Sequence, residues 1–275
     1  MAPRLNAARE SVVGVVDIGV NLTHDSFDAD REAVIGRALD ARVDTMIITG
    51  STVESSRAGL ALARRHPGVL FATAGIHPHH AAQADSTAPA SLRELYSHSP
   101  VVAIGECGLD HFRNFSPRED QERIFRQQLE LAVELEAPVF LHQRDAHEHF
   151  IGILQEYRPS LTRGVAHCFT GGAAELEACL ELDLYIGITG WICDERRGAH
   201  LKPLIRRIPA DRLMIETDAP YLLPRDLHPK PGTRRNEPMH LPHILATVAA
   251  AAGRQAEEIA AETADNARRF FALGE

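Results

Sequence analysis

Several apolar runs in this sequence are followed by a side chain that could bind a metal ion or transfer a proton. Glu106 follows VVAIG, His142 follows PVFL, His167 follows GVA, and Asp218 follows LMIET. Side chains at the carboxyl ends of parallel strands project toward one shared mouth, so residues far apart in the sequence can meet there. This recurrence predicts a metal-centred enzyme.

These four side chains offer nitrogen and oxygen donors and no thiolate. The set suits Mn, Zn, Fe or Mg, and it differs from a closed structural zinc site. Glu106 could hold one ion or bridge two, and Asp218 would also act as the base that takes a proton from a coordinated water. A single histidine after a strand is more often a hydrogen-bonded core residue. Metal ligands are favoured here only because such side chains follow several strands.

His77, in GIHPHH, follows another apolar run and joins Glu106 and Asp218 as a catalytic candidate. Its imidazole could contact a phosphate oxygen, orient a leaving group or bind metal. We expect His79 and His80 to lie on a loop.

Arginines near the presumed mouth could bind phosphate, because a guanidinium fork matches two phosphate oxygens at once. The proline-rich stretch 220–242 is also dense in charge, so we expect a structured loop that crosses the mouth. The lone tryptophan of the chain could stack on a base. The candidate substrate-binding residues are Arg113, Arg225, Arg234, Arg235 and Trp191.

These residues need a scaffold that brings strand ends together. Apolar runs rich in Val and Ile alternate with segments of helical periodicity, which is typical of parallel βαβ units. One helix is expected over 119–136 after a capping box of Ser116 and Glu119, and another after a box of Ser51 and Glu54. The predicted strands are 12–18, 44–50, 69–76, 101–106, 138–142, 164–168, 184–189 and 212–217.

Eight such units predict an α/β fold, a TIM-type (β/α)8 barrel of the metal-dependent hydrolase kind. An open doubly wound sheet is the alternative, but its ligand crevice would use fewer strand ends. A length of 275 residues suits one barrel, which typically needs about 250. We expect a single domain over residues 1–275, with about residues 1–10 disordered.

The composition limits the partners and the compartment. A net charge of −9 disfavours nonspecific tracking along nucleic acids, so any such contact should be local. The apolar stretches fall short of the roughly 18 residues that span a membrane. The four cysteines form no CxxC pair, which predicts reduced thiols and a cytoplasmic location. We expect a monomer that does not bind membranes.

The chain resembles the TatD family of metal-dependent deoxyribonucleases nearly from end to end. Several long strings in one order carry the resemblance, and together they are more specific than any short motif. They are DIGVNLT (17–23), AGIHPHH (74–80), IGECGLDHFRNF (104–115), LHQRDAHE (141–148), AHCFTGG (166–172), GITGWICDERRG (187–198), IETDAPYLLPRD (215–226) and RRNEPMHLPHI (234–244).

The resemblance implies a TIM-type barrel, a divalent metal usually taken as magnesium, and 3′-to-5′ exonuclease action on DNA. Single-stranded 3′ ends would be preferred, RNA would be a second substrate, and DNA repair is the suggested use. By matching motifs, Glu106, His142, His167 and Asp218 would be metal ligands, and His77 would act at the scissile phosphate. Histidines favour Mn or Zn over Mg, so the identity of the metal stays open.

The first strand departs from the family pattern. Most relatives carry an HxH pair where this chain has Gly19 and Asn21, so either one or two ions remain compatible with the sequence. Asp17, at the end of the first apolar run, offers an oxygen donor on the same strand.

Two other functions fit the same residues. A barrel hydrolase could act on a small cyclic amide, ester or lactone, although the arginines of the mouth loop favour a phosphodiester. A metal-binding accessory protein with little catalysis is the other alternative, and the acids and histidines at the strand ends disfavour it.

Overall fold

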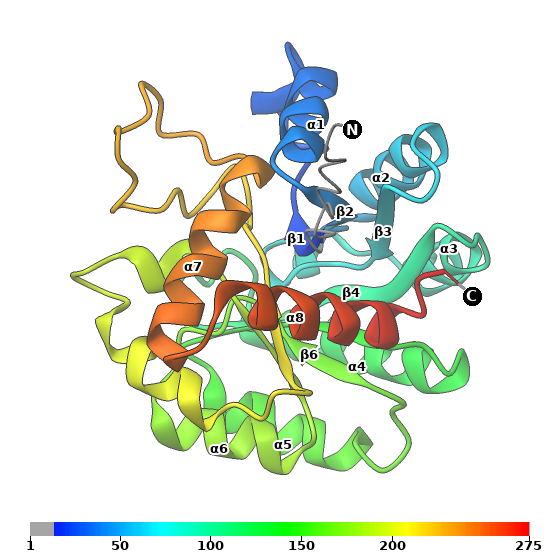
Figure 1. Cartoon of the computed structure of the whole chain (residues 1–275). Helices are drawn as coiled ribbons and strands as arrows, with labels where there is room; N and C mark the ends of the chain where they lie inside the picture. Colours follow the sequence, from blue (N-terminus) through cyan, green and yellow to red (C-terminus); the bar gives the residue numbers. More distant parts are fainter. Residues whose placement is uncertain (1–13, 275) are drawn as a thin grey trace, which may run out of the picture.

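The computed structural model describes residues 14–274. Eight parallel strands form one sheet in sequence order, with helices between them and around them (Figure 1). The predicted α/β barrel is therefore confirmed, with an observed strand for each predicted one. The strands are β1 (Val15–Val20), β2 (Val43–Ile48), β3 (Leu70–Ala74), β4 (Val101–Asp110), β5 (Val139–Arg144), β6 (Gly164–Ala166), β7 (Tyr185–Ile188) and β8 (Leu213–Ile215).

The first strand meets the segment after the last one, which brings the two edges of the sheet together. The N–H of Asp218 donates to the carbonyl of Gly19 at 2.9 Å, and the N–H of Asn21 donates to the carbonyl of Ala219 at 2.7 Å. An open doubly wound sheet would leave these edges apart, so this alternative is excluded.

The helices lie on the outside of the strands, and five short 3-10 helices lie in the connections. The α-helices are α1 (Arg31–Asp40), α2 (Val53–Arg65), α3 (Ala88–Tyr96), α4 (Arg118–Glu134), α5 (His147–Tyr157), α6 (Ala173–Glu181), α7 (Leu241–Ala252) and α8 (Ala256–Phe271). The 3-10 helices are η1 (Asp25–Phe27), η2 (Pro78–Gln83), η3 (Gly190–Cys193), η4 (Ala199–Arg207) and η5 (Pro238–His240).

Both predicted capping boxes are wrong in detail. Before α4, the hydroxyl of Ser116 makes no capping bond and donates to the carbonyl of His79 at 3.0 Å, because Ser116 is buried against η2. At the start of α2 the box lies one residue later, between Thr52 and Ser55. The predicted helix over 119–136 is α4, and it ends two residues early.

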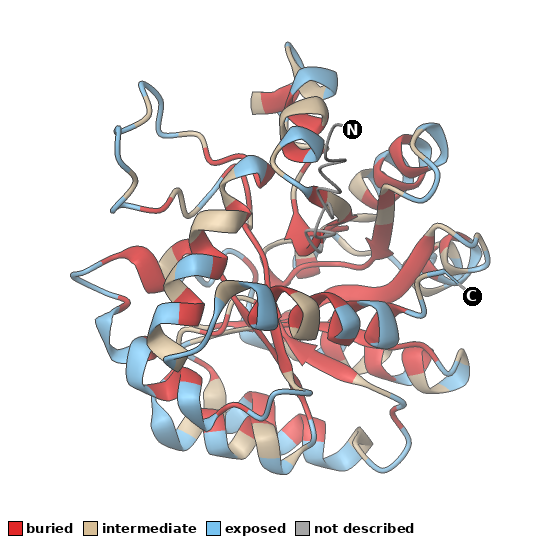
Figure 2. Ribbon diagram, viewed as in Figure 1, coloured by how far each residue is buried: buried red, intermediate tan, exposed pale blue. Residues whose placement is uncertain are grey.

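Strand side chains alternate between two apolar layers, as the period of two in a β-strand requires. In β2, for example, Ile47 belongs to an inner cluster that takes side chains from around the barrel, whereas Met46 and Ile48 belong to the larger cluster under the helices. Figure 2 shows the result, with buried strands and helices whose outer faces are exposed. The core is thus a filled barrel inside a layer of helices.

Helix α8 covers the amino end of the barrel. Phe270 and Phe271 join the inner cluster, and the amide of Asn266 donates to the carbonyl of Leu213, at the start of β8, at 2.8 Å. The carboxyl end of the barrel is therefore the end left for a site, as is usual for this fold.

Two sequence predictions fall partly or wholly outside the described residues, namely the disordered segment 1–10 and the start of the strand at 12–18. Within residues 14–274, no helix is long and apolar enough to cross a bilayer.

Candidate active site

The five predicted catalytic and metal-binding residues meet at the carboxyl end of the barrel. Oε1 of Glu106 lies 2.8 Å from Nδ1 of His142, 3.5 Å from Nε2 of His77 and 3.7 Å from Nε2 of His167. Oδ1 of Asp218 lies 4.0 Å from Nε2 of His167. Five different strands, or the segments just after them, supply these side chains, so the barrel itself makes the cluster.

Glu106 reaches the mouth from within β4, and not from the strand end that the sequence predicted. The register between β4 and β5 shifts between Gly105 and Cys107, so Glu106 is the extra residue of a β-bulge, which re-aims a side chain. Its N–H donates to the carbonyl of Gly50 at 2.8 Å. A Cβ on Gly105, which has φ +129°, would lie 2.2 Å from the carbonyl oxygen of Phe140, so only glycine fits before Glu106.

The carboxylate of Glu106 and the imidazoles around it affect one another's pKa values. Burial opposes ionisation of Glu106, but the imidazoles of His77, His167 and His142 hold its pKa well below the usual range. Burial lowers the pKa of His77 well below its usual value, so this ring is neutral at pH 7. Nδ1 of His77 accepts the N–H of His79 at 3.1 Å, which leaves the proton of the neutral ring on Nε2, facing Glu106.

The donor set fits a divalent cation. Two groups at this mouth have donor atoms within 4.8 Å of one another, namely His77, Glu106 and His142, and His167, Cys168 and Asp218. Burial opposes protonation of His142, although the carboxylates of Asp110 and Glu106 raise its pKa. Nε2 of His142 is buried and makes no hydrogen bond within residues 14–274, since Oδ2 of Asp110 lies 3.8 Å away. A buried polar atom without a partner is costly, and a cation at this position would supply one.

Glu216, which the sequence analysis missed, orients His167. This carboxylate is fully buried, with Oε2 at 2.5 Å from Nδ1 of His167 and Oε1 accepting the N–H of Cys168 at 2.6 Å. Burial opposes protonation of His167, but Glu216 and Glu106 raise its pKa to about 10. Carboxylates that hold the far nitrogen of a metal-binding imidazole are common around metal sites. In the sequence, Glu216 is an acidic residue within the otherwise apolar run LMIE, and this pattern is what could have identified it.

Asp218 is held next to this pair by Asn21. Burial, with the charges of Glu106 and Glu216, raises the pKa of Asp218 to about 7. The amide of Asn21 donates to Oδ1 of Asp218 at 3.0 Å. Asn21 therefore contributes a hydrogen-bond donor at a position where most relatives were expected to carry an imidazole.

Asp17 does not lie at the mouth, contrary to the sequence prediction. β1 continues past it to Val20, and its carboxylate is fully buried. It accepts the N–H of Thr217 at 2.9 Å, the hydroxyl of Thr217 at 2.5 Å and the N–H of Gly19 at 3.3 Å. Burial raises the pKa of Asp17 to about 7. These bonds use the carboxylate to join β1 to the segment after β8.

Asp110, which the sequence did not single out, and His79, which was expected on a loop, form a second layer behind His77. Nε2 of His79 lies 2.6 Å from Oδ2 of Asp110, and the ring centres of His77 and His79 are 4.2 Å apart. Asp110 also accepts the backbone N–H groups of Phe112 and Arg113. His79 lies in η2, and its ring supports the ring of His77.

The predicted phosphate-binding arginines differ in what they contact. Arg113 is exposed just after β4, and Arg234 is exposed and makes no hydrogen bond or ion pair with the described part of the chain. Arg225 lies 3.4 Å from Glu195 and 3.6 Å from Asp194, with 43% of its side chain exposed. Arg113 and Arg234 are therefore the more available cations.

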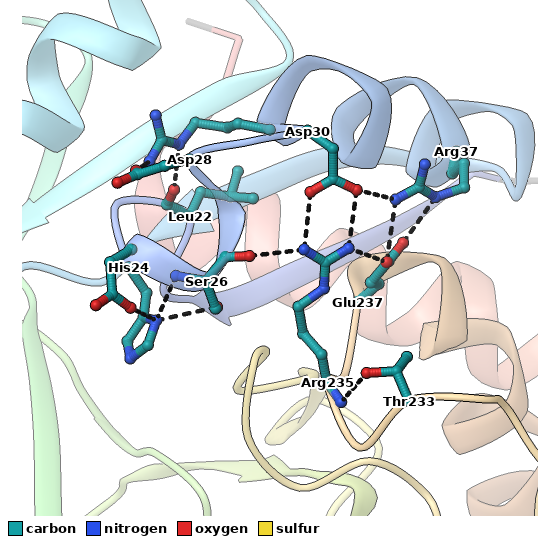
Figure 3. Close-up of polar contacts among 11 residues, drawn as sticks. Leu22, His24, Ser26, Asp28, Asp30, Arg37, Thr233, Arg235 and Glu237 are labelled. Carbon is teal, nitrogen blue, oxygen red and sulfur yellow. Dashed lines mark hydrogen bonds and ion pairs between the residues drawn. The ribbon is translucent and has the colours of Figure 1, made fainter.

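Arg235 belongs instead to an ion-pair network between α1 and the segment before η5 (Figure 3). Its two terminal nitrogens donate to both oxygens of Asp30, to Glu237 and to the carbonyl of Ser26, all at 2.7 to 2.8 Å. Four of the five guanidinium donors are used in this way. Arg235 is therefore not among the residues that we propose to bind substrate.

Trp191 is also less available than the sequence suggested. The guanidinium of Arg197 lies 4.2 Å from the centre of its ring, and the indole N–H donates to the carbonyl of Arg197 at 3.3 Å. One face of the partly buried indole is thus occupied by the protein.

A protein family and several known proteins match nearly the whole chain. The family described as TatD related DNase matches residues 16–272. A "3'-5' ssDNA/RNA exonuclease TatD" of Erwinia tasmaniensis is 56% identical over 257 residues, which covers 94% of this chain and 99% of the relative. A protein of the same name from Erwinia amylovora has the same identity and coverage.

Solved structures of related proteins share the fold. A TatD homologue of Escherichia coli, YJJV, has a TM-score of 0.86 at 28% identity, with 95% of this chain and 99% of that chain covered. A TatD family hydrolase of Entamoeba histolytica has a TM-score of 0.83 at 25% identity, with the same coverage of both chains.

Proposed function

Because this chain belongs to the TatD related DNase family, we propose that it is a metal-dependent 3′-to-5′ exonuclease that hydrolyses phosphodiester bonds of DNA. Single strands are its preferred substrate, and RNA is a second one; the names of its relatives print both ssDNA and RNA. The observation that carries the proposal is the convergence of Glu106, three imidazoles and Asp218 at the open end of the barrel.

Glu106, His142, His167 and Asp218 would hold the cation. A bound divalent ion would lower the pKa of a coordinated water and neutralise charge on the phosphate. The family expectation is Mg, whereas the imidazoles suit Mn or Zn, so the choice between these metals is part of the proposal. Oε1 of Glu106 lies 2.8 Å from Nδ1 of His142 and 3.7 Å from Nε2 of His167, so one carboxylate oxygen lies near both imidazoles, which suits a ligand shared between two positions.

Asp218 has the properties of the base. Asn21 fixes Oδ1, which leaves Oδ2 for the attacking water, and a bound cation would keep the carboxylate ionised and able to accept a proton. Glu106 is suited to the opposite role, because its depressed pKa keeps it an anionic ligand.

His77 is suited to donate a hydrogen bond to the reacting phosphate. Its neutral ring carries the proton on Nε2, because Nδ1 accepts from His79. A neutral N–H can stabilise charge on a phosphate oxygen or on the departing 3′ oxygen. Asp110 holds His79 in place, so Asp110 and His79 together position His77.

Few cations are needed for this reaction. The protein is acidic, with a net charge of −9, but a site that acts on chain ends requires only local contacts. Arg113 and Arg234 are the proposed phosphate contacts, and Arg225 is a weaker candidate because of its acidic neighbours. The four cysteines are free thiols. A cytoplasmic location and a monomer remain the expectations from the sequence.

The test is hydrolysis of single-stranded DNA labelled at either end. With Mg or Mn, a 5′-labelled strand should shorten stepwise, whereas a 3′-labelled strand should release its label in the first turnover. A Glu106→Ala/Asp218→Ala double variant should be inactive, and Glu94→Ala, an exposed glutamate on α3, should match the parent. A folded parent that leaves DNA intact but opens small lactams or esters would replace the proposal with the carbonyl hydrolase.

A further inference from the structure

Exposed aromatic rings flank the candidate active site. The large hydrophobic side chains exposed within residues 14–274 include only three aromatic ones, Phe112, Phe115 and Tyr221. All three follow β4 or β8, the strands that lead to Glu106 and Asp218. Phe115 is 67% exposed and Tyr221 is 51% exposed, so more than half of each residue is open to a ligand.

Phe115 and Tyr221 lie on opposite sides of the mouth. In an eight-stranded barrel with strands in sequence order, β4 and β8 are half a turn apart. The ring of Phe115 lies 4.7 Å from the ring of His79, on the side of the mouth where His77 lies. The N–H of Tyr221 donates to the carbonyl of Asp218 at 2.9 Å, so Tyr221 lies beside the proposed base.

Each of these two rings is held by one imidazole and is open elsewhere. Phe115 meets His79 at 66° between ring planes, and Tyr221 meets His24 at 86° and 5.6 Å. A contact of this edge type covers at most one face of an aromatic ring, so at least one face of Phe115 and of Tyr221 is left for a flat ligand. Burial and the carboxylates of Asp218, Asp25 and Glu106 raise the pKa of Tyr221.

The other aromatic candidates are occupied. The guanidinium of Arg144 lies 4.1 Å from the ring centre of Phe112, and that of Arg113 lies 5.6 Å from it. Arg197 covers Trp191 in the same way, at 4.2 Å. Phe115 and Tyr221 are therefore the exposed rings beside the metal-ligand cluster on which no guanidinium is stacked.

We propose that Phe115 and Tyr221 are stacking platforms for the two unpaired bases on either side of the scissile phosphodiester. The inference rests on the proposed exonuclease function and deepens it. Two neighbouring bases can reach opposite sides of the mouth only if they unstack from each other, which a single strand does more easily than a duplex. Stacking accepts any base because every base has a π face, and it does not depend on the sugar.

The experiment combines variants of the rings with removal of the bases. The variants are Phe115→Ala, Phe115→Leu, Phe115→Trp, Tyr221→Ala and Tyr221→Phe, with Leu39→Ala as a control for loss of an exposed apolar side chain on α1. The substrates are a 5′-labelled oligothymidylate and the same strand with abasic sugars at its two 3′-terminal positions. Because the rings are exposed, thermal unfolding of all variants should match the parent.

Each alanine variant should raise the KM for oligothymidylate by about 5- to 150-fold, the range that stacking of one base represents, with kcat changed less than about threefold. Tryptophan at 115 and phenylalanine at 221 should restore the KM, whereas leucine at 115 should not. On the abasic strand the parent should already have the raised KM, and the alanine variants should add less than about twofold.

The stacking role would be overturned if the alanine variants raised the KM equally on both substrates, or if Phe115→Leu kept the KM of the parent. Either result would leave the exonuclease proposal intact. A folded parent that cleaves neither strand would overturn the proposed function, and this inference with it.

Discussion

Replacing Arg235 with alanine should lower the stability of the protein, whereas replacing Arg234 should not. The guanidinium of Arg235 binds Asp30 through both of its terminal nitrogens and also binds Glu237 (Figure 3). Its neighbour Arg234 is exposed and forms no polar contact with residues 14–274. The two substitutions remove the same charge from adjacent positions, so each serves as the control for the other.

The expected loss lies between two limits. Removing one partner of a fully buried ion pair costs about 3–5 kcal/mol, whereas an exposed pair contributes about 0–1 kcal/mol. The side chains of Arg235, Asp30 and Glu237 are 23%, 33% and 10% exposed, which places this network between the limits. Arg37 also binds both Asp30 and Glu237, so neither carboxylate would be left without a cation. We therefore expect a loss of about 1–3 kcal/mol.

Urea denaturation followed by circular dichroism would measure this loss. At about 2–4 °C per kcal/mol for a large domain, the Tm of Arg235→Ala should also fall measurably. Arg235→Lys should be intermediate, because an ammonium keeps the charge but not the bidentate geometry. If Arg235→Ala instead unfolds like the parent and raises the KM for DNA as Arg234→Ala does, the structural role assigned to Arg235 is wrong.

The pH dependence gives a second test of the same network. Hydrogen bonds from Arg235 and Arg37 hold the pKa of Asp30 well below its usual range. A depressed carboxyl pKa stabilises the fold at pH values above the unfolded pKa, near 4, and this contribution is lost as the pH falls through the folded value. The stability gap between parent and Arg235→Ala should therefore be constant at neutral pH and narrow below about pH 4.

Three further predictions concern the site and its support. Glu216→Gln should weaken metal binding about 10- to 100-fold, because the carboxylate that orients His167 is lost. Titration calorimetry with Mn would measure this, and an unchanged affinity would contradict it. The raised pKa of Asp17 means that the metal-free protein should lose stability as the pH rises from about 4 to about 7. In Asp17→Asn, the free energy of unfolding measured by denaturation should change less with pH over the same range. A pH dependence equal to that of the parent would refute this. Gln128→Leu should cost about 2–4 kcal/mol, because the buried amide pairs with both the N–H and the carbonyl of Ile76. A loss below about 1 kcal/mol on denaturation would show that water replaces the amide.

The sequence by itself determined the barrel and most of the cluster. Apolar runs rich in β-branched residues and separated by helical segments specify parallel strands, and parallel strands in sequence order specify where their carboxyl ends lie. His142, His167 and Asp218 could therefore be placed at one mouth without any contact being known. Such positions depend on local periodicity and on topology, which the sequence carries directly.

Only the tertiary structure decided how individual side chains are used. A bulge in β4 turns Glu106 into the mouth, and it depends on the close approach of Gly105 to β5. Arg234 and Arg235 look alike in the sequence, but only Arg235 reaches Asp30, which is 205 positions away. Glu216 orients His167 only because the barrel brings the two residues together across 49 positions of sequence. The partners of buried polar groups are chosen by packing between distant segments, and no local pattern encodes them.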